Sequence, residues 1–407
     1  MWRGFFYSKN ILTISIFYSQ EFWAKNIVKI IIFKYTDKNN LNKQLYFLLL
    51  MKIWLDLRLL KSGDTYSTFI ALLLQKLIST DWEDTYTLYL SAWTNAQFPD
   101  FVNVELIKEE PGTFTEQLHF SRKLKKDDNA LMIFFNEDKP LRYKGDYIVF
   151  VKDLKEIHYE SKKTTLGKFF EGLFLNTSLE NAKKIICFEN HTKNELNEKL
   201  NIAENKLEII YPFFTPTPIS NEKVIWNIKT KYSIKWEYFI YSGGNGNNKN
   251  LSKLVEVFRK LHLKKQKISL VVLEQEITED LSFRKEVVEA DIVDKVFFIW
   301  DTTPEEKKAF YESAVGTIFP SLYESFPFAL TEAISYNSPI LASSINQIQE
   351  IMWESIAYFS PVSTIDMIEA IENFVSMGNK PWNYDDLLNK YNADSSAKQL
   401  LKVIKEL

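Results

Sequence analysis

The segment FPSLYESFPFALTEAISYNSPILASS, residues 319–344, decides both the expected fold and the expected site. It begins at the end of an apolar strand-like run, passes through a polar loop and an apolar helical stretch, and finishes in a second strand-like run. Pro327 favours a helix start directly after it, because proline is tolerated in the first turn of a helix. The segment therefore predicts strand, loop, helix and strand, with Glu324 in the loop and Glu332 on the helix.

The two glutamates of this segment are the first candidate ligand contacts. On one continuous helix they would lie about 12 Å apart, from a rise of about 1.5 Å per residue. With Glu324 in a loop, both carboxylates could instead face one long polar ligand, and the helix N-terminus between them favours an anion. A nucleotide-sugar has this form, with hydroxyl groups at both ends and a diphosphate between. Spacing alone favours two solvated surface acids, so the hypothesis depends on the rest of the chain.

Outward from this segment, short apolar runs alternate with amphipathic stretches from residue 51 to residue 407. Strands are expected at 52–57, 85–92, 130–135, 146–153, 181–190, 238–244, 268–273, 295–300, 316–321 and 338–344, and helices at 65–78, 114–126, near 192, at 251–263 and 304–314, from 328 and at 395–407. This alternation predicts parallel sheets with crossover helices. We expect an α/β protein of two doubly wound, Rossmann-like domains that face each other across a cleft.

Three prolines in YPFFTPTPIS (211–220) mark the expected linker, because proline fixes φ and lacks an N–H donor. The expected domains are 51–215 and 216–390, followed at 391–407 by a helix that packs back toward the first domain. Residues 1–50 hold seven Lys/Arg against two acids and no uncharged run of 18 residues, so no membrane-spanning helix is predicted there. An upstream extension outside the fold, with the first strand opening at Met51, is the main interpretation. A basic, aromatic membrane-surface segment is the alternative.

Composition excludes several classes of function. A net charge of −3 gives no global attraction to nucleic acid. The single cysteine, Cys187, lies in an apolar run, which indicates a buried thiol and suits a reducing compartment such as the cytoplasm. The four histidines show no ligand spacing, and no Asp-x-Asp occurs that would hold a divalent metal on a diphosphate. We therefore expect no metal and no cofactor.

Two glycine-containing loops at strand ends are further candidates. GGNGNNKN (243–250) combines glycines that permit close backbone approach with a following helix N-terminus and the charge of Lys249, a combination suited to a diphosphate. An ordinary Asn/Gly turn fits it equally well. In SGDT (62–65), Gly63 would allow a phosphate or a donor sugar to approach, and a plain turn is again the alternative.

At these residues the sequence resembles glycosyltransferase family 4, the retaining, mannosyltransferase-like group 1 glycosyltransferases of GT-B fold. Segment 319–344 looks like the donor-binding signature of that family with its Glu-x7-Glu, and 241–261 looks like its diphosphate loop and following helix. Segments 184–213 and 295–314 are similar to the end of its first domain and to the strand and helix before the signature. The resemblance covers about residues 51–407 and includes its N-terminal MKIWLDLR.

The resemblance implies roles for particular residues. Lys249 would stabilise the departing diphosphate, Glu332 would hold ribose, and Glu324 with the backbone near Phe326–Phe328 would hold the donor sugar and phosphates. The implied catalytic residues are Glu324, Lys249 and Asp153, and the implied donor-binding residues are Gly63, Gly243, Gly244, Lys249, Glu324, Phe326, Pro327, Phe328 and Glu332. The first domain would then bind the acceptor and the second domain the nucleotide-sugar donor.

The implied reaction transfers a hexose from a UDP- or GDP-sugar to a glycan or lipid-linked acceptor with retention, in cell-surface polysaccharide biosynthesis. The nucleotide-sugar is a substrate, no metal takes part, and nucleic acid is no partner. The expected location is the cytoplasm, with peripheral association at the cytoplasmic face of a membrane. The donor and the glycan or lipid-linked acceptor are the two partners that the resemblance implies.

The sequence departs from the family at two positions that bear on catalysis. Gly244 stands where the family commonly has arginine, and Lys152–Asp153 stands where it has His-Asp. These departures motivate the main rival hypothesis, a degenerate GT-B protein that binds a sugar nucleotide without transferring the sugar. A GT-B-like epimerase or phosphorylase and a non-enzymatic structural role are also compatible with the sequence.

Overall fold

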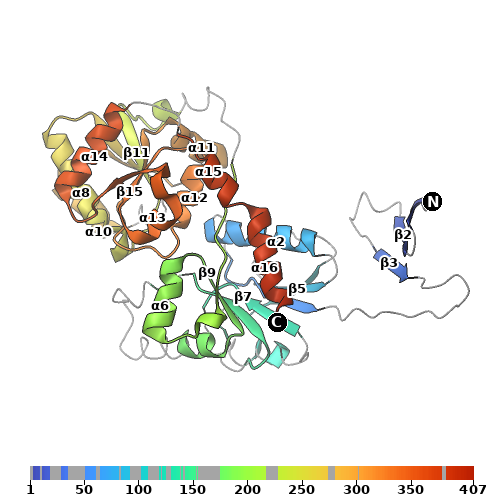
Figure 1. Cartoon of the computed structure of the whole chain (residues 1–407). Coiled ribbons are helices and arrows are strands. Elements are labelled where there is room, and N and C mark those ends of the chain that lie inside the picture. Colours follow the sequence, from blue (N-terminus) through green and yellow to red (C-terminus); the bar gives the residue numbers. More distant parts are fainter. Residues whose placement is uncertain are drawn as a thin grey trace, which may run out of the picture.

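The structure is a computed structural model of the chain. It describes residues 51–60, 65–81, 84–91, 102–108, 119–120, 122–124, 130–137, 139–140, 143–152, 154, 175–216, 228–273, 280–300, 302–377 and 382–407, and the backbone of three strands before them. Those strands, β1 (Arg3–Lys9), β2 (Leu12–Tyr18) and β3 (Lys29–Lys34), pair antiparallel in the order β1-β2-β3. Figure 1 shows β2 and β3 to one side of two larger bodies. No strands were expected in this extension from the sequence.

The first parallel sheet has seven described strands in the order β10-β9-β8-β7-β4-β5-β6. They are β4 (Lys52–Asp56), β5 (Thr85–Ser91), β6 (Asn103–Ile107), β7 (Ala130–Phe134), β8 (Tyr147–Phe150), β9 (Lys184–Cys187) and β10 (Leu207–Ile209). Helices α2 (Thr65–Thr80) and α6 (Asn190–Leu200) accompany them. The apolar runs of β7 and β8 are buried along their whole length, as expected for parallel strands covered on both faces. We call this part the first domain.

The second parallel sheet has six described strands in the order β13-β12-β11-β14-β15-β16. They are β11 (Glu237–Tyr241), β12 (Ile268–Val272), β13 (Val296–Phe298), β14 (Gly316–Phe319), β15 (Ile340–Ser343) and β16 (Ala357–Phe359). The helices are α8 (Leu251–Leu263), α10 (Leu281–Glu289), α11 (Pro304–Ser313), α12 (Phe328–Ser335), α13 (Asn346–Met352), α14 (Thr364–Ser376) and α15 (Asp385–Lys390). We call this part the second domain. The prediction of two Rossmann-like α/β domains is confirmed.

Each parallel sheet contains a point at which the strand order reverses. In the second sheet the chain runs outward from β11 to β13, and then returns to the centre and runs the other way from β14 to β16. In the first sheet the reversal lies between β4 and β7. Ligands of open parallel sheets bind beyond the carboxyl ends of the strands at such a point. The fold therefore directs attention to the loops that follow β11 and β14.

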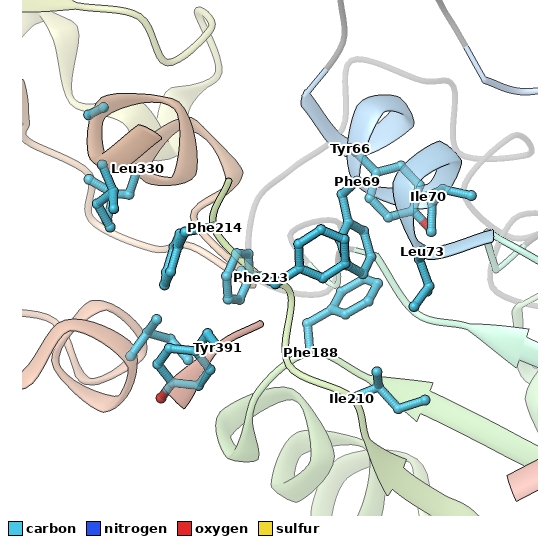
Figure 2. Close-up of a cluster of buried hydrophobic side chains, with 14 of the residues drawn as sticks. Tyr66, Phe69, Ile70, Leu73, Phe188, Ile210, Phe213, Phe214, Leu330 and Tyr391 are labelled. Carbon is cyan, nitrogen blue, oxygen red and sulfur yellow. The ribbon is translucent and has the colours of Figure 1, made fainter. Parts of the chain in front are cut away.

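One buried apolar cluster is shared by the two domains. It includes Ile53 and Leu55 of β4 and Ile240 of β11, while the opposite face of each sheet has a cluster of its own. Rings join the two halves: the ring centroid of Phe69 of α2 lies 5.8 Å from that of Phe328, the first residue of α12, and Phe188 and Phe213 lie beside Phe69 in the same cluster (Figure 2). The domains are therefore held together by apolar burial.

The chain returns to the first domain at its last helix, α16 (Ala393–Lys405), which packs against α2 and crosses it in the view of Figure 1. Lys76 of α2 pairs with Asp394 at 2.7 Å, and Lys405 Nζ lies 2.6 Å from Asp84 Oδ2. Residues 211–216 between the domains have neither helix nor strand, as the prolines predicted. Residues 217–227 lie outside the described residues, so the boundary at 215/216 stays a prediction.

Candidate functional site

Lys249 and Glu324 meet at the reversal point of the second sheet. Lys249 ends the short 3₁₀ helix Asn247–Lys249 in the loop after β11, and Glu324 lies in the loop after β14. Lys249 Nζ donates to both carboxylate oxygens of Glu324, at 2.6 Å to Oε1 and 2.8 Å to Oε2. Ser321 Oγ donates to Oε1 at 2.6 Å. Two residues that the sequence placed 75 positions apart thus form one cation–carboxylate pair at the place where ligands bind such sheets.

Two asparagines that flank Lys249 tie its loop to the loop of Glu324. Asn248 Nδ2 donates to the carbonyl of Tyr323 at 2.9 Å, and the Asn248 carbonyl accepts from the Leu322 N–H at 2.7 Å. Asn250 precedes α8 with a φ of 58° and donates to the carbonyl of Pro320 at 3.0 Å. Asparagine tolerates this left-handed conformation better than most residues. Lys249 is therefore preorganised by its neighbours.

The glycines before Lys249 serve different steric purposes. A Cβ on Gly243 would come within 2.7 Å of the Tyr241 hydroxyl, which donates to the Gly244 carbonyl at 2.8 Å. Gly244 has a φ of +75°, where side chains are strained, but nothing lies within 4 Å of where its Cβ would be. The turn thus requires glycine for close packing at one position and for backbone conformation at the next. The absent arginine of the family would have open space here.

Glu332 is held by two residues of α11. Lys307 Nζ lies 2.5 Å from Glu332 Oε1, and the Tyr311 hydroxyl donates to Glu332 Oε2 at 2.9 Å. Tyr311 is fully buried, and its oxygen also lies 2.6 Å from Ser242 Oγ, directly after β11. Burial raises the pKa of Tyr311 well above its usual value, and the charge of Glu332 acts in the same direction. Tyr311 therefore stays a neutral hydrogen-bond donor.

The aromatic residues of the signature point toward the first domain. Helix α12 begins at Phe328 after Pro327, as predicted. The Phe328 ring lies 5.1 Å from that of Tyr66 and 5.4 Å from that of Phe188, and the Phe326 ring lies 4.8 Å from the Phe328 ring. These side chains form part of the contact between the domains. What Phe326, Pro327 and Phe328 can offer a ligand is accordingly their backbone.

The first domain approaches the Glu324 loop at two described positions. The Leu154 N–H donates to Ser325 Oγ at 3.2 Å, and the Tyr323 hydroxyl donates to Glu195 Oε2 of α6 at 3.1 Å. The residues on either side of Glu324 are thus tied across the domain boundary. Asp153, the neighbour of Leu154, and Gly63 both lie outside the described residues, so their placement in the site stays a prediction.

The arrangement can bind a long ligand that is anionic in the middle and rich in hydroxyl groups at its ends. Lys249 and the N–H groups of α8 and α12 suit phosphate oxygens, and the carboxylates accept from hydroxyl groups. Three residues beside Glu332, namely Ser242, Lys307 and Tyr311, were not among the predicted site residues. Lys307 and Tyr311 are four residues apart on a helix that could be predicted, so they share one face, but nothing in the sequence aims that face at Glu332.

Two negative findings apply to the residues that the structure describes. Among them, no group of three or more His, Cys, Asp or Glu side chains is arranged to hold a metal ion. None of the helices found in this part of the chain has both the length and the apolarity needed to span a membrane. Cys187 is buried, and burial raises the pKa of its thiol above the ordinary range, so it is no candidate nucleophile.

The GT-B class of fold consists of two Rossmann-like domains that face each other. This chain has that arrangement, with the loops of Lys249 and Glu324 on its second domain. Solved structures support this: the chain covers 98% of a glycosyltransferase from Rickettsia africae with a TM-score of 0.65 at 14% identity. It covers all of Anabaena Alr3699/HepE, solved in complex with UDP-glucose, with a TM-score of 0.67 at 12% identity. In each case 88% of the present chain is matched.

Residues 224–386 match the family model "Glycosyl transferases group 1". The O-antigen chain mannosyltransferase RfbU of Salmonella typhimurium is 20% identical over 245 residues, which are 60% of this chain and 65% of the relative. The O-antigen chain mannosyltransferase B of Escherichia coli is 22% identical over 203 residues, which are 48% of this chain and 52% of the relative. The chain therefore spans less than two thirds of either relative. The group 1 resemblance is confirmed, and the finer assignment to family 4 stays a prediction.

Proposed function

We propose that this protein is a glycosyltransferase that moves a hexose from a UDP- or GDP-sugar to a glycan or lipid-linked acceptor with retention. The observation that carries the proposal is the Lys249–Glu324 pair at the reversal point of the second sheet, within the group 1 region. Names of relatives support a polysaccharide product, since two are O-antigen chain mannosyltransferases. We place the reaction at the cytoplasmic face of a membrane, where a lipid-linked acceptor would be presented.

Each site residue has a role in this proposal. Lys249 stabilises the negative charge that develops on the diphosphate as the sugar–phosphate bond breaks, and it does so without a metal or other cofactor. Glu324 exchanges its contact with Lys249 for hydroxyl groups of the donor sugar, and Glu332 accepts from the ribose hydroxyls. Gly243 and Gly244 let the diphosphate approach the backbone, as Gly63 does from the first domain. Asp153 acts on the acceptor side.

The test is nucleotide release from a panel of UDP- and GDP-hexoses by the full chain, with lipid-linked glycan acceptors. We expect release of UDP or GDP from one donor, with Lys249→Met lowering the rate at least about 100-fold, in the range found for single electrostatic contacts to a transition state. Lys253→Met on α8 is the matched control, because Lys253 pairs with Glu256 and not with a site residue. Equal rates for wild type and Lys249→Met would refute the assigned role.

A specific observation favours one second candidate, binding of the sugar nucleotide without transfer. Gly244 leaves empty the space that an arginine would fill, so a charge-assisted contact worth about 1.5–3 kcal/mol is absent. Calorimetric binding of UDP or GDP by the wild type, with no release from any donor in the panel, would establish this candidate. Turnover with any one donor would eliminate it.

A further inference from the structure

We propose that Lys307 and Tyr311 are positioning residues that aim the Glu332 carboxylate at a ribose diol, and so make the site select ribonucleotides over deoxyribonucleotides. This inference rests on the proposed function and adds a specificity to it. It starts from the observation that both oxygens of Glu332 are held by one helix, α11, at 2.5 Å by Lys307 and at 2.9 Å by Tyr311.

The direction of the hydrogen bonds in this network follows from the protons available. An ionised carboxylate only accepts, so the single Tyr311 proton points at Glu332 Oε2. The Tyr311 oxygen must then accept the proton of Ser242, whose Oγ lies 2.6 Å away. A relay of donors therefore runs from the end of β11 to Glu332, and it starts one residue before Gly243 of the diphosphate loop.

The network leaves acceptor capacity on Glu332. Each carboxylate oxygen has two lone-pair sites, and the two contacts from α11 use one on each oxygen. The Glu332 side chain remains 16% exposed and that of Lys307 28% exposed, so a ligand can reach them, whereas Tyr311 is fully buried. One free lone pair on each oxygen matches the two hydroxyl groups of a ribose cis-diol.

Rigidity is what the two α11 residues add. A free glutamate has several rotatable bonds and must be ordered when it binds a ligand, which weakens binding. Tyr311 cannot rotate away because it is packed on all sides, with the Tyr336 ring 5.2 Å from its own. Lys307 fixes the other oxygen and supplies the balancing charge. The carboxylate is thus ordered before the nucleotide arrives.

The experiment measures dissociation constants of UDP and GDP and of their 2′,3′-dideoxy analogues for the full-length wild type, Tyr311→Phe and Lys307→Met. We expect each substitution to weaken ribonucleotide binding about tenfold and dideoxynucleotide binding less than about twofold, because only the former uses Glu332. Two matched controls should leave the ribo/dideoxy ratio unchanged. Tyr238→Phe removes a buried hydroxyl that bonds the Phe310 carbonyl at 2.9 Å, and Lys308→Met removes the neighbouring lysine, which pairs with Glu312.

The outcomes separate this inference from the proposed function. Equal weakening of both nucleotide types would overturn the positioning role and leave the proposed function standing. A wild type that binds both types equally would also overturn it, because Glu332 would then not contact the diol. A wild type that binds no nucleoside diphosphate would overturn the proposed function and this inference together. Lys307 is partly exposed, so Lys307→Met keeps the test decisive if Tyr311→Phe fails to fold.

Discussion

Replacement of Lys249 by methionine should destabilise the second domain measurably, even without ligand. The Lys249 side chain is 20% exposed and that of Glu324 is 11% exposed, so the exposure of this ion pair is intermediate between that of a buried pair and that of a surface pair. Breaking a buried pair from one side costs about 3–5 kcal/mol, and an exposed pair is worth about 0.2–1 kcal/mol. We expect a loss of about 2 kcal/mol for Lys249→Met, because Glu324 keeps the hydrogen bond from Ser321.

A double-mutant cycle with Glu324→Gln isolates the interaction energy between Lys249 and Glu324. Glutamine removes the unpaired charge, so the double variant should be more stable than Lys249→Met alone, with a coupling energy of about 1–2 kcal/mol. Urea denaturation followed by tryptophan fluorescence gives the four free energies of unfolding. The more exposed pair Lys253–Glu256 on α8, with side chains 28% and 40% exposed, serves as the control cycle, for which we expect less than about 0.5 kcal/mol. Additivity of the Lys249 and Glu324 effects within about 0.3 kcal/mol would refute the reasoning.

Three further predictions concern stability. Burial, opposed by the Thr192 hydrogen bond and aided by the charge of Glu350, raises the pKa of Glu189 from 4.5 to about 8. The folded protein therefore binds this proton more tightly than the unfolded chain, so the free energy of unfolding falls as the pH rises from about 4.5 to about 8. Glu189→Gln should flatten this pH dependence by on the order of 4 kcal/mol in urea titrations. An unchanged pH dependence in the variant would contradict the assignment. Phe188→Ala should lower the free energy of unfolding by about 3–5 kcal/mol in the same assay, because Phe188 is 1% exposed and its ring contacts Phe69 of the first domain and Phe328 of the second. A loss below about 1 kcal/mol would mean that this aromatic contact does not hold the domains together. Lys405→Met should lower stability by about 1 kcal/mol and speed amide hydrogen exchange in α16, since Lys405 is 40% exposed beside a buried Asp84 carboxylate; unchanged exchange would show that this pair does not anchor the helix.

The parts of the fold that could be predicted are those with strong local signals. Apolar runs predicted β7, β12 and β14 to within two residues, because strands buried on both faces are largely apolar, whereas the strand expected at 146–153 extends three residues beyond the end of β8. The edge strands β6, β10 and β16 were missed. Most side chains of β6 are exposed or half-buried, and β10 and β16 have three residues each, so none of them leaves a recognisable pattern.

The candidate site likewise has one part that could be predicted from the sequence and one part that could not. Pro327 predicted the loop position of Glu324 and the start of α12, because proline acts on its immediate neighbours. The partners of Glu332 could not be predicted, since Tyr311 lies 21 residues before it and Ser242 a further 69 residues before Tyr311. Such contacts depend on how β11, α11 and α12 pack, and no local periodicity encodes that.

The return of α16 to α2 makes the second domain an insertion within the first. Within the described residues the backbone passes between the domains after β10 and again before α16, and the Phe214 N–H donates to the Tyr391 carbonyl at 3.3 Å, so these two connections touch. Two adjoining covalent connections form a hinge between the domains. They permit one domain to rotate relative to the other about the line that joins the connections, and they resist twisting and separation of the domains. Proteolysis at the linker alone would consequently give two fragments, the first domain and the second domain with α16, that stay associated through the packing of α16 on α2.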